Sequence, residues 1–269
     1  MLPNLLCILF KEMIVTTCIP TDALKPFIKH YLVIESDQEV INRLLPDTSV
    51  VLVFRYKGNV NYTAGGIETN IPASVLTGLK KSSRLVNYAA GSAAILVIFK
   101  TAAAGSFFKV PLHELFEGSV PLDNFISSRQ ASEIEEQLSA AKNNVERINL
   151  IEQFLFSQYK GAGGDQLVLA AIEKMYIAKG FYKIKDLADS MYISQDAFEK
   201  RFRKATGASP KQLSSIIRLR NIVATGKKHE NFNQLAYDAG YFDQSHFNND
   251  FRLFTGQTPS DFFKSPLFW

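Results

Sequence analysis

Residues 184–210 read IKDLADSMYISQDAFEKRFRKATGASP, and residues 232–259 read FNQLAYDAGYFDQSHFNNDFRLFTGQTP. The two stretches share residue types at a single offset of 49 positions. The matching pairs are Phe198 and Phe247, Phe202 and Phe251, Gly207 and Gly256, and Pro210 and Pro259. Four matches at one offset indicate an internal repeat. The chain is therefore organised around a small unit that occurs twice.

Each copy has the pattern of a helix, a tight turn and a second helix. Apolar residues spaced three and four apart mark the first helix. Ser194 and Asp243 then stand where a side-chain oxygen caps the start of the next helix. We therefore expect second helices at about 194–205 and 243–254. The shared glycine fits a left-handed C-cap, and the shared proline fits the first position of a following helix.

The paired phenylalanines place one stripe of each second helix in a core, which fixes the opposite face. The polar residues on that face are Asp196, Glu199, Lys200 and Arg203 in the first copy, and Ser245, Asn248, Asn249 and Arg252 in the second. Such side chains suit hydrogen bonds to base edges in a DNA major groove: Asn to adenine, Lys to guanine, and an acid to the cytosine amine. Arg203 and Arg252 lie further along each helix and are better placed for phosphate.

The complete pattern resembles the DNA-binding domain of AraC-type transcriptional regulators. It comprises L-A, S-x-x-x-F-x-x-x-F and G-x-S-P, a connecting R-L-R, and then L-A-x-x-x-G-[FY]-x-D-x-S-x-F-x-x-x-F-x-x-x-x-G-x-x-P, over about residues 165–263. The resemblance implies two helix-turn-helix units joined by one long helix, here Pro210 to about Thr225, with their recognition helices in successive major grooves. By position it implies base reading by Gln195, Asp196, Glu199, Lys200, Ser245, His246, Asn248 and Asn249. Phosphate contacts are expected from Arg203, Lys204, Lys211 and Arg252.

The second unit departs from the family pattern at two neighbouring positions. Asn249 stands where the family frequently has Arg, and Asp250 adds a negative charge beside it.

The net positive charge of the protein is concentrated in the C-terminal part of the chain. Residues 1–164 hold 15 Lys and Arg against 15 Asp and Glu, whereas residues 165–269 hold 15 against 11. Nine basic residues fall within 199–228 and are Lys200, Arg201, Arg203, Lys204, Lys211, Arg218, Arg220, Lys227 and Lys228. A basic cluster of this kind is the footprint expected at DNA phosphates; a solvated helical face is the alternative.

Composition is that of a globular chain long enough for two domains: 269 residues, 46% hydrophobic and 21% charged. No apolar run approaches the ~20 residues of a membrane span. Residues 1–10 lack the basic leader and cleavage site of a signal peptide, and are either a first strand or an extension upstream of a start at Met13 rather than Met1. Cys7 and Cys18 have no partners at metal spacing, which fits a reducing cytoplasm.

Residues 14 to about 120 have the pattern of strands and turns. Ser49–Tyr56 is a β-branched and aromatic run and Val60–Thr63 alternates after it, so we expect a hairpin. Ala94–Lys100 is another apolar strand candidate. The pattern predicts a compact β-barrel or sandwich. Leu45–Asp47 and Phe108–Phe116 resemble the cupin-like sensory domains of some AraC-type regulators.

This half lacks the residues of a metal site or of common catalytic motifs. Only His30 and His113 precede the linker, and no His-x-His pair occurs. No G-x-S-x-G, P-loop or Cys–His pairing is present either. We therefore expect no metal, no cofactor and no enzyme activity. Candidates to line a small-molecule pocket, or alternatively to pack or face solvent, are Arg55, Tyr56, Tyr62 and Tyr88.

Residues 131–159 change to helical spacing, with Asn143-Asn144 as a break between two helices. These helices either pair two subunits, as in the family, or cover the barrel. Residues 161–164 read Gly-Ala-Gly-Gly and suggest a flexible linker. The expected organisation is α+β. A β-rich sensory or dimerisation domain at 1–160 and a linker at 161–165 precede an all-α double helix-turn-helix domain at 166–269, which begins with a helix over 166–178.

The sequence thus predicts a cytoplasmic regulator that binds DNA at specific sequences and is not an enzyme. Its expected partners are double-stranded DNA, a small-molecule effector that the sequence does not identify, and a second copy of the chain through the N-terminal domain. Two alternatives remain: a helical protein-interaction module without DNA binding, and an enzyme built on the β domain.

Overall fold

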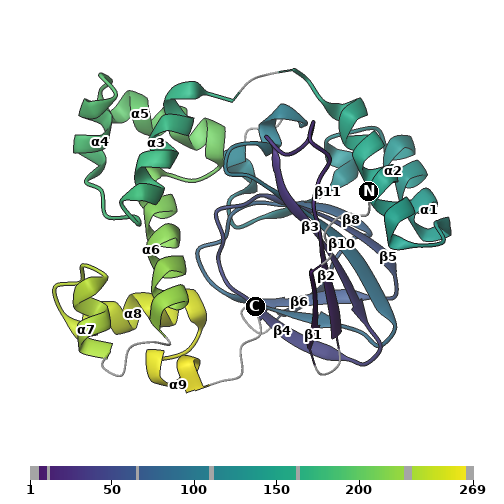
Figure 1. The fold of residues 1–269 in the computed structure, drawn as a ribbon, viewed down its shortest axis with the longest axis horizontal. Helices are drawn as coiled ribbons and strands as arrows, with labels where there is room; N and C mark the ends of the chain where they lie inside the picture. Colours follow the sequence, from purple (N-terminus) through teal and green to yellow (C-terminus); the bar gives the residue numbers. More distant parts are fainter. Residues whose placement is uncertain are drawn as a thin grey trace.

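The computed structural model describes residues 6–10, 13–64, 67–108, 112–161, 164–226 and 232–264. Within these ranges a β-sandwich is followed by helices, which confirms the predicted α+β class. Figure 1 shows the sandwich on one side and helices α3–α9 on the other. Met1, one of the two candidate start residues, lies outside the described residues. No helix in these ranges is long and apolar enough to cross a membrane.

The strands form one sheet of seven strands, in the order β1-β2-β3-β10-β5-β8-β11, and one of four, in the order β4-β9-β6-β7. Within each sheet, every strand pairing in the described residues is antiparallel. Their bounds are β1 Leu6–Phe10, β2 Met13–Cys18, β3 Ile28–Ser36, β4 Val40–Leu44, β5 Val51–Lys57, β6 Val60–Ala64, β7 Ile67–Asn70, β8 Ser74–Thr77, β9 Arg84–Tyr88, β10 Ser92–Phe99 and β11 Ser119–Pro121.

The hairpin predicted for residues 49–63 is wrong. β5 pairs with β10 and β8 in the larger sheet, whereas β6 pairs with β9 and β7 in the smaller one. Gly58, between the two strands, has a φ of +64°. This left-handed conformation is accessible to glycine without strain, and it turns the chain from one sheet into the other. Alternation along the sequence identified both strands but not their partners.

β5 separates two apolar regions because its side chains alternate between the faces of the sheet. Leu52 and Phe54 are fully buried on the face covered by α1 (Ser128–Ala140) and α2 (Asn144–Gln158). The rings of Phe54 and Phe154 meet edge to face at 5.9 Å. Val51 and Val53 face a cavity between the two sheets.

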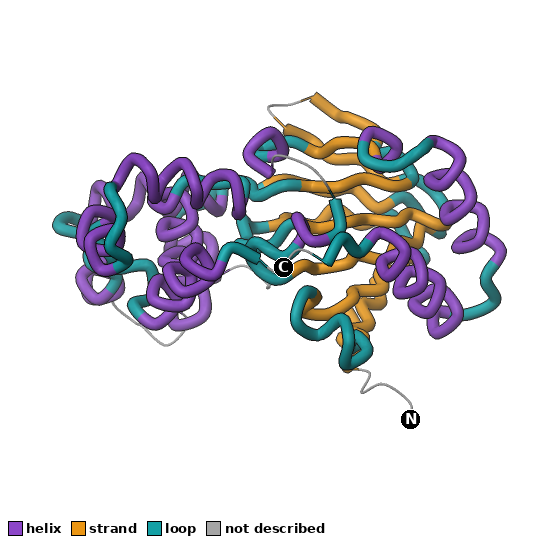
Figure 2. Tube along the Cα trace, turned by 90° about the horizontal axis from the view of Figure 1, so that it is seen from above, coloured by secondary structure: helices purple, strands orange, loops and turns teal. Residues whose placement is uncertain are grey.

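The predicted pair of helices is confirmed, and so is the break between them. Asn143 caps α2 by accepting a hydrogen bond from the Glu146 amide at 2.9 Å. Ser127 caps α1 in a capping box with Gln130. Figure 2 shows these helices on the side of the sandwich away from the C-terminal helices. They cover one face of the larger sheet, and pairing of two subunits through them stays a prediction.

Two short 3-10 helices lie between β10 and β11 and a third precedes α1, and in the described residues seven α-helices follow α2. The 3-10 helices are η1 Ala104–Ser106, η2 Leu112–Leu115 and η3 Leu122–Asn124. The α-helices are α3 Gln166–Ile177, α4 Ile184–Ser190, α5 Gln195–Thr206, α6 Pro210–Gly226, α7 Phe232–Asp238, α8 Gln244–Thr255 and α9 Pro259–Lys264. α6 is the long connecting helix expected from the sequence, and α3 is the helix expected at 166–178.

Candidate nucleic-acid interface

α5 is built as the first repeat predicts. The Ser194 side chain accepts a hydrogen bond from the Ala197 amide, which starts the helix. Phe198 and Phe202 are completely buried, and Gly207 ends the helix with a φ of +85°. The polar face opposite the phenylalanines is therefore turned outward. Its exposed residues are Gln195, Asp196, Lys200, Arg203 and Lys204, and Glu199 is half-buried.

α8 repeats this construction. Asp243 accepts a hydrogen bond from the His246 amide at 2.7 Å, and Gly256 ends the helix with a φ of +75°. The inward stripe consists of Phe247, Phe251 and Phe254. The outward residues Ser245, His246, Asn249 and Arg252 are exposed, and Asn248 is half-buried.

On α5 the acidic side chain is already engaged along the helix. Glu199 accepts a hydrogen bond from Gln195 at 2.9 Å and pairs with Arg203 at 3.4 Å. These are exposed contacts between residues four apart, and such pairs contribute only a few tenths of a kcal/mol, roughly 0.3–0.5. Lys200 takes part in no ion pair among the described residues. Its ammonium group is thus left available at the exposed surface.

On α8 the acidic side chain points back into its own unit. The Tyr241 hydroxyl donates a hydrogen bond to the Asp250 carboxylate at 3.0 Å, and His246 Nε2 lies 3.7 Å from the same carboxylate. Burial, then the charge of Asp250, raises the pKa of Tyr241 above its usual range. Tyr241 therefore stays protonated and donates. The sequence shows that Asp250 follows Asn249, but it does not indicate that Tyr241 is the hydrogen-bond partner of Asp250.

Three arginines of the basic cluster have partners within the protein. Arg201 pairs with Asp165, the N-cap of α3. Arg218 lies over the rings of Phe181 and Tyr241, at 5.3 and 5.5 Å. Arg220 pairs with Asp47 of the sandwich at 3.6 Å. The grouping of these three arginines in a DNA-facing cluster stays a prediction, and each of them contacts another element of the protein. Lys227 and Lys228 lie outside the described residues.

Both outward helices end against the sandwich. A Cβ atom at Gly207 would lie 2.6 Å from the Leu112 carbonyl oxygen of η2. Arg43 of β4 donates a hydrogen bond to the Thr255 carbonyl at 3.1 Å, at the end of α8. Figure 1 shows the α4–α5 and α7–α8 units at opposite ends of α6. Contact with the sandwich thus falls at the C-terminal ends of α5 and α8 and leaves their outward faces exposed.

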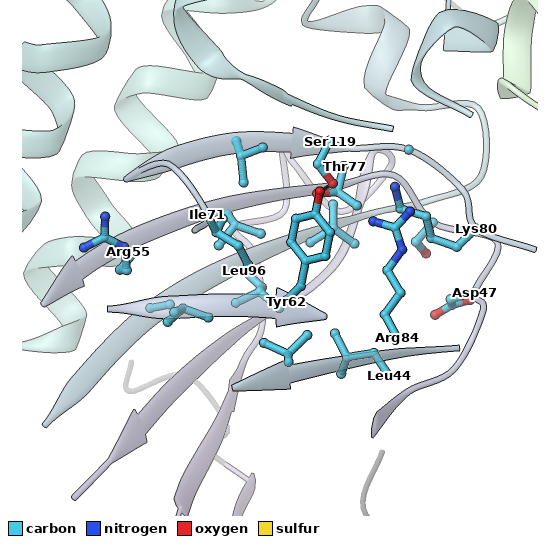
Figure 3. A pocket seen from close by; sticks show the side chains of 18 of the residues that line it. Leu44, Asp47, Arg55, Tyr62, Ile71, Thr77, Lys80, Arg84, Leu96 and Ser119 are labelled. Atoms are coloured by element: carbon cyan, nitrogen blue, oxygen red, sulfur yellow. Dashed lines mark hydrogen bonds between the residues drawn. The ribbon is translucent and has the colours of Figure 1, made fainter. Parts of the chain in front are cut away.

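A separate cavity lies between the two sheets of the sandwich (Figure 3). Three of the four residues named as pocket candidates line it: Arg55, Tyr62 and Tyr88. Tyr56 does not, because its hydroxyl donates to Glu35 at 3.1 Å and its ring lies under Arg147. The sequence missed Lys80 and Arg84, which also line the cavity. Lys80 lies in the loop between β8 and β9 and Arg84 is the first residue of β9, where no periodic pattern indicates the direction of either side chain.

Comparison with protein families assigns the repeat region. Residues 187–265 match the family described as "Helix-turn-helix domain", and residues 16–121 match "Domain of unknown function (DUF6597)". The predicted helix-turn-helix domain is thereby confirmed at the C-terminus, and a separate family model matches the β domain before it. No curated protein matches the chain.

Solved structures that match the chain include an apo form of ToxT from Vibrio cholerae. It is 14% identical with a TM-score of 0.47, and the match covers 87% of this chain and 96% of ToxT. Another is the AraC-like transcriptional activator CuxR, 11% identical with a TM-score of 0.33, covering 80% of this chain and 81% of CuxR.

The bond between Tyr241 and Asp250 should stabilise the second unit measurably. We expect Tyr241→Phe to lower the free energy of opening of α8 by about 1 kcal/mol, because a hydrogen bond to a carboxylate is lost from a partly buried site. Hydrogen exchange of the α8 amides measures this quantity. Tyr237→Phe is the matched control, since Tyr237 is 75% exposed. Equal protection in both variants would show that the Tyr241 hydroxyl contributes nothing.

Proposed function

We propose that this protein is a transcriptional regulator that binds specific DNA sequences through α5 and α8. The observation that carries the proposal is the duplicated construction. Two capped helices of equal length each bury a phenylalanine stripe and each present a polar face, and one long helix joins them. A helix with a polar outward face fits the major groove, and units of this type read successive grooves on one side of the duplex.

The base-reading side chains we assign are those on the outward faces. They are Gln195, Asp196, Glu199 and Lys200 on α5, and Ser245, His246, Asn248 and Asn249 on α8. Lys200 is the strongest of these, because it is exposed, cationic and outside the ion pairs of the described chain. The neutral amides of α8 suit adenine better than phosphate. The phosphate contacts are assigned to Arg203, Lys204, Lys211 and Arg252, all of which are exposed.

Control of DNA binding is proposed to pass through the segment Arg43–Thr48. Leu44, Leu45 and Asp47 line the cavity of the sandwich. The same segment contacts the helical half, since Asp47 pairs with Arg220 and the Thr48 hydroxyl lies 2.6 Å from the Tyr176 hydroxyl of α3. A ligand that shifts this segment would move its contacts on α3, α6 and α8 together. Residues 1–160 would then be the sensory domain, residues 161–165 the linker, and residues 166–269 the DNA-binding domain, acting in the cytoplasm.

The charge state of Asp47 supports this role. Burial on its own would raise its pKa, but Lys29, Arg220 and hydrogen bonds from Thr48 lower it below the usual value. Asp47 is therefore an anion near neutral pH. Its pairs with Lys29 on β3 (3.8 Å) and Arg220 on α6 (3.6 Å) connect the sandwich to the connecting helix.

A second candidate function is a protein-interaction module that has kept the helical fold. Exposed aromatic side chains favour it: Phe242 is fully exposed in the second turn, and Tyr192 is 99% exposed in the first. Gel shifts on random duplex over a salt series separate the two functions. A DNA-binding protein loses affinity steeply as salt rises, whereas an interaction module shows no shift at any salt concentration.

Lys200→Ala should weaken binding to a duplex selected from a random pool by roughly 1–3 kcal/mol, because a contact to a base edge is lost. Its affinity for random duplex should change much less. Titration by fluorescence anisotropy measures both affinities. Lys57→Ala, which removes an exposed lysine from the sandwich, is the control. Equal weakening on selected and random duplex would mean that Lys200 contacts phosphate only.

Arg203→Ala should instead weaken binding on every duplex and flatten its salt dependence. Removal of one phosphate contact lowers the slope of log K against log salt by about 0.9 for double-stranded DNA. The slope is measured on the selected duplex between low and physiological salt. A slope identical to that of the unchanged protein would rule out a phosphate contact by Arg203.

A further inference from the structure

The cavity between the sheets is mainly apolar. Its volume is about 170 Å³. Aliphatic side chains from both sheets form its walls: Val51, Val53, Val60, Ile71, Val75, Val86 and Leu96. Figure 3 shows Ile71 and Leu96 between Arg55 at one end and Lys80, Arg84 and Asp47 at the other. An occupant should therefore have an apolar body and, at one end, a polar group.

Two cations define the polar end. Lys80 is half-buried, and its ammonium group donates a hydrogen bond to the Gly118 carbonyl. Arg84 donates to the Glu117 carbonyl at 2.6 Å and lies 5.2 Å from the centre of the Tyr62 ring. Both cations thus bond to neutral carbonyl oxygens, and neither takes part in an ion pair among the described residues.

The neighbouring carboxylates are committed to other partners. Asp47 is paired with Lys29 and Arg220, and the Glu117 carboxylate accepts a hydrogen bond from the Lys81 amide. Burial, and then repulsion from Arg84, lowers the pKa of Lys80 to about 7, although Glu117 acts in the opposite direction. Holding a protonated Lys80 and Arg84 together beside apolar walls without a bound counterion is costly, and the lowered pKa of Lys80 reflects that cost. An anion at this end would remove that cost.

A buried hydroxyl points to the same conclusion. Ser49 lines the cavity and is only 4% exposed, and its Oγ has no hydrogen-bond partner within the described chain. Buried polar atoms are nearly always satisfied. The hydroxyls of Thr77 and Ser119, which also line the cavity, bond to each other at 3.0 Å. Ser49 is therefore a donor that still lacks its acceptor.

We propose that this cavity binds an organic carboxylate with an apolar body, and that Lys80 and Arg84 hold the carboxylate. The inference rests on the proposed function, because it names the class of effector that would act through the segment Arg43–Thr48. The aliphatic walls take the apolar body. The Ser49 hydroxyl is a further donor for an acceptor on the ligand. A sugar does not suit the site, because aliphatic walls would leave most of its hydroxyls without partners.

The test uses the full chain and three probes that differ only in the charge of the head group: decanoate, 1-decanol and decyltrimethylammonium. Isothermal titration calorimetry should show that decanoate binds at least about tenfold more tightly than the other two, since a charge-assisted hydrogen bond is lost with either of them. A fourth probe, 4-phenylbutyrate, distinguishes aromatic from alkyl carboxylates. Tighter binding by either carboxylate supports the proposal.

Substitutions of Lys80 and Arg84 test whether these two side chains bind the carboxylate. Lys80→Met and Arg84→Met should each weaken carboxylate binding about tenfold or more. Lys80→Arg keeps the positive charge and should therefore retain most of the affinity for the carboxylate. Lys81→Met is the matched control, because Lys81 is adjacent in sequence, exposed and outside the cavity. Thermal unfolding of each variant verifies that it is folded.

The proposal is overturned if decanoate and 1-decanol bind equally, if neither carboxylate binds, or if Lys80→Met and Arg84→Met bind as tightly as Lys81→Met. DNA binding by the same unliganded preparation is measured separately by gel shift, so that the ligand and the proposed function are tested independently. DNA binding without carboxylate binding would refute only the assignment of the ligand. Carboxylate binding without any DNA binding would refute the proposed regulator and leave the ligand site intact.

Discussion

Burial of paired phenylalanines is the constraint on which the C-terminal half depends. Phe198 and Phe202 on α5, and Phe247 and Phe251 on α8, are essentially inaccessible to solvent. Each such ring contributes several kcal/mol, roughly 3–5 by comparison with truncation to alanine. Because these rings have to face inward, helical periodicity fixes which side chains face outward. The polar faces proposed to read DNA are thus a geometric consequence of the core.

The C-terminal ends of α5 and α8 also contact the sandwich. Gly207 and Gly256 stop α5 and α8 in left-handed turns, and both turns lie against the sandwich, at Leu112 and Arg43. The helical half is therefore held at its C-terminal helix ends while its N-terminal helix ends remain exposed. The segment that provides Arg43 and Asp47 also forms part of the cavity wall. A single stretch of chain thus borders both the cavity and the helical half.

The sequence predicted what depends on local chemistry. Caps at Ser194 and Asp243, left-handed glycines and phenylalanine stripes are encoded within a few residues, and the structure confirms each of them. Features that depend on distant partners were missed. β5 and β6 were recognised as strands but joined in the wrong hairpin, and Arg218 and Arg220 were assigned to a DNA-facing cluster although their partners lie on other elements. Lys80 and Arg84 come together only when the sheets close, so no spacing in the sequence indicates them.

If α5 and α8 enter successive major grooves on one face of the duplex, hydroxyl-radical footprinting of the full chain on a selected duplex should reveal both contacts. We expect two protected segments on the same face, separated by one helical turn of about 10 base pairs. A single protected segment, or two segments on opposite faces of the duplex, would show that the two helices do not bind DNA in this way.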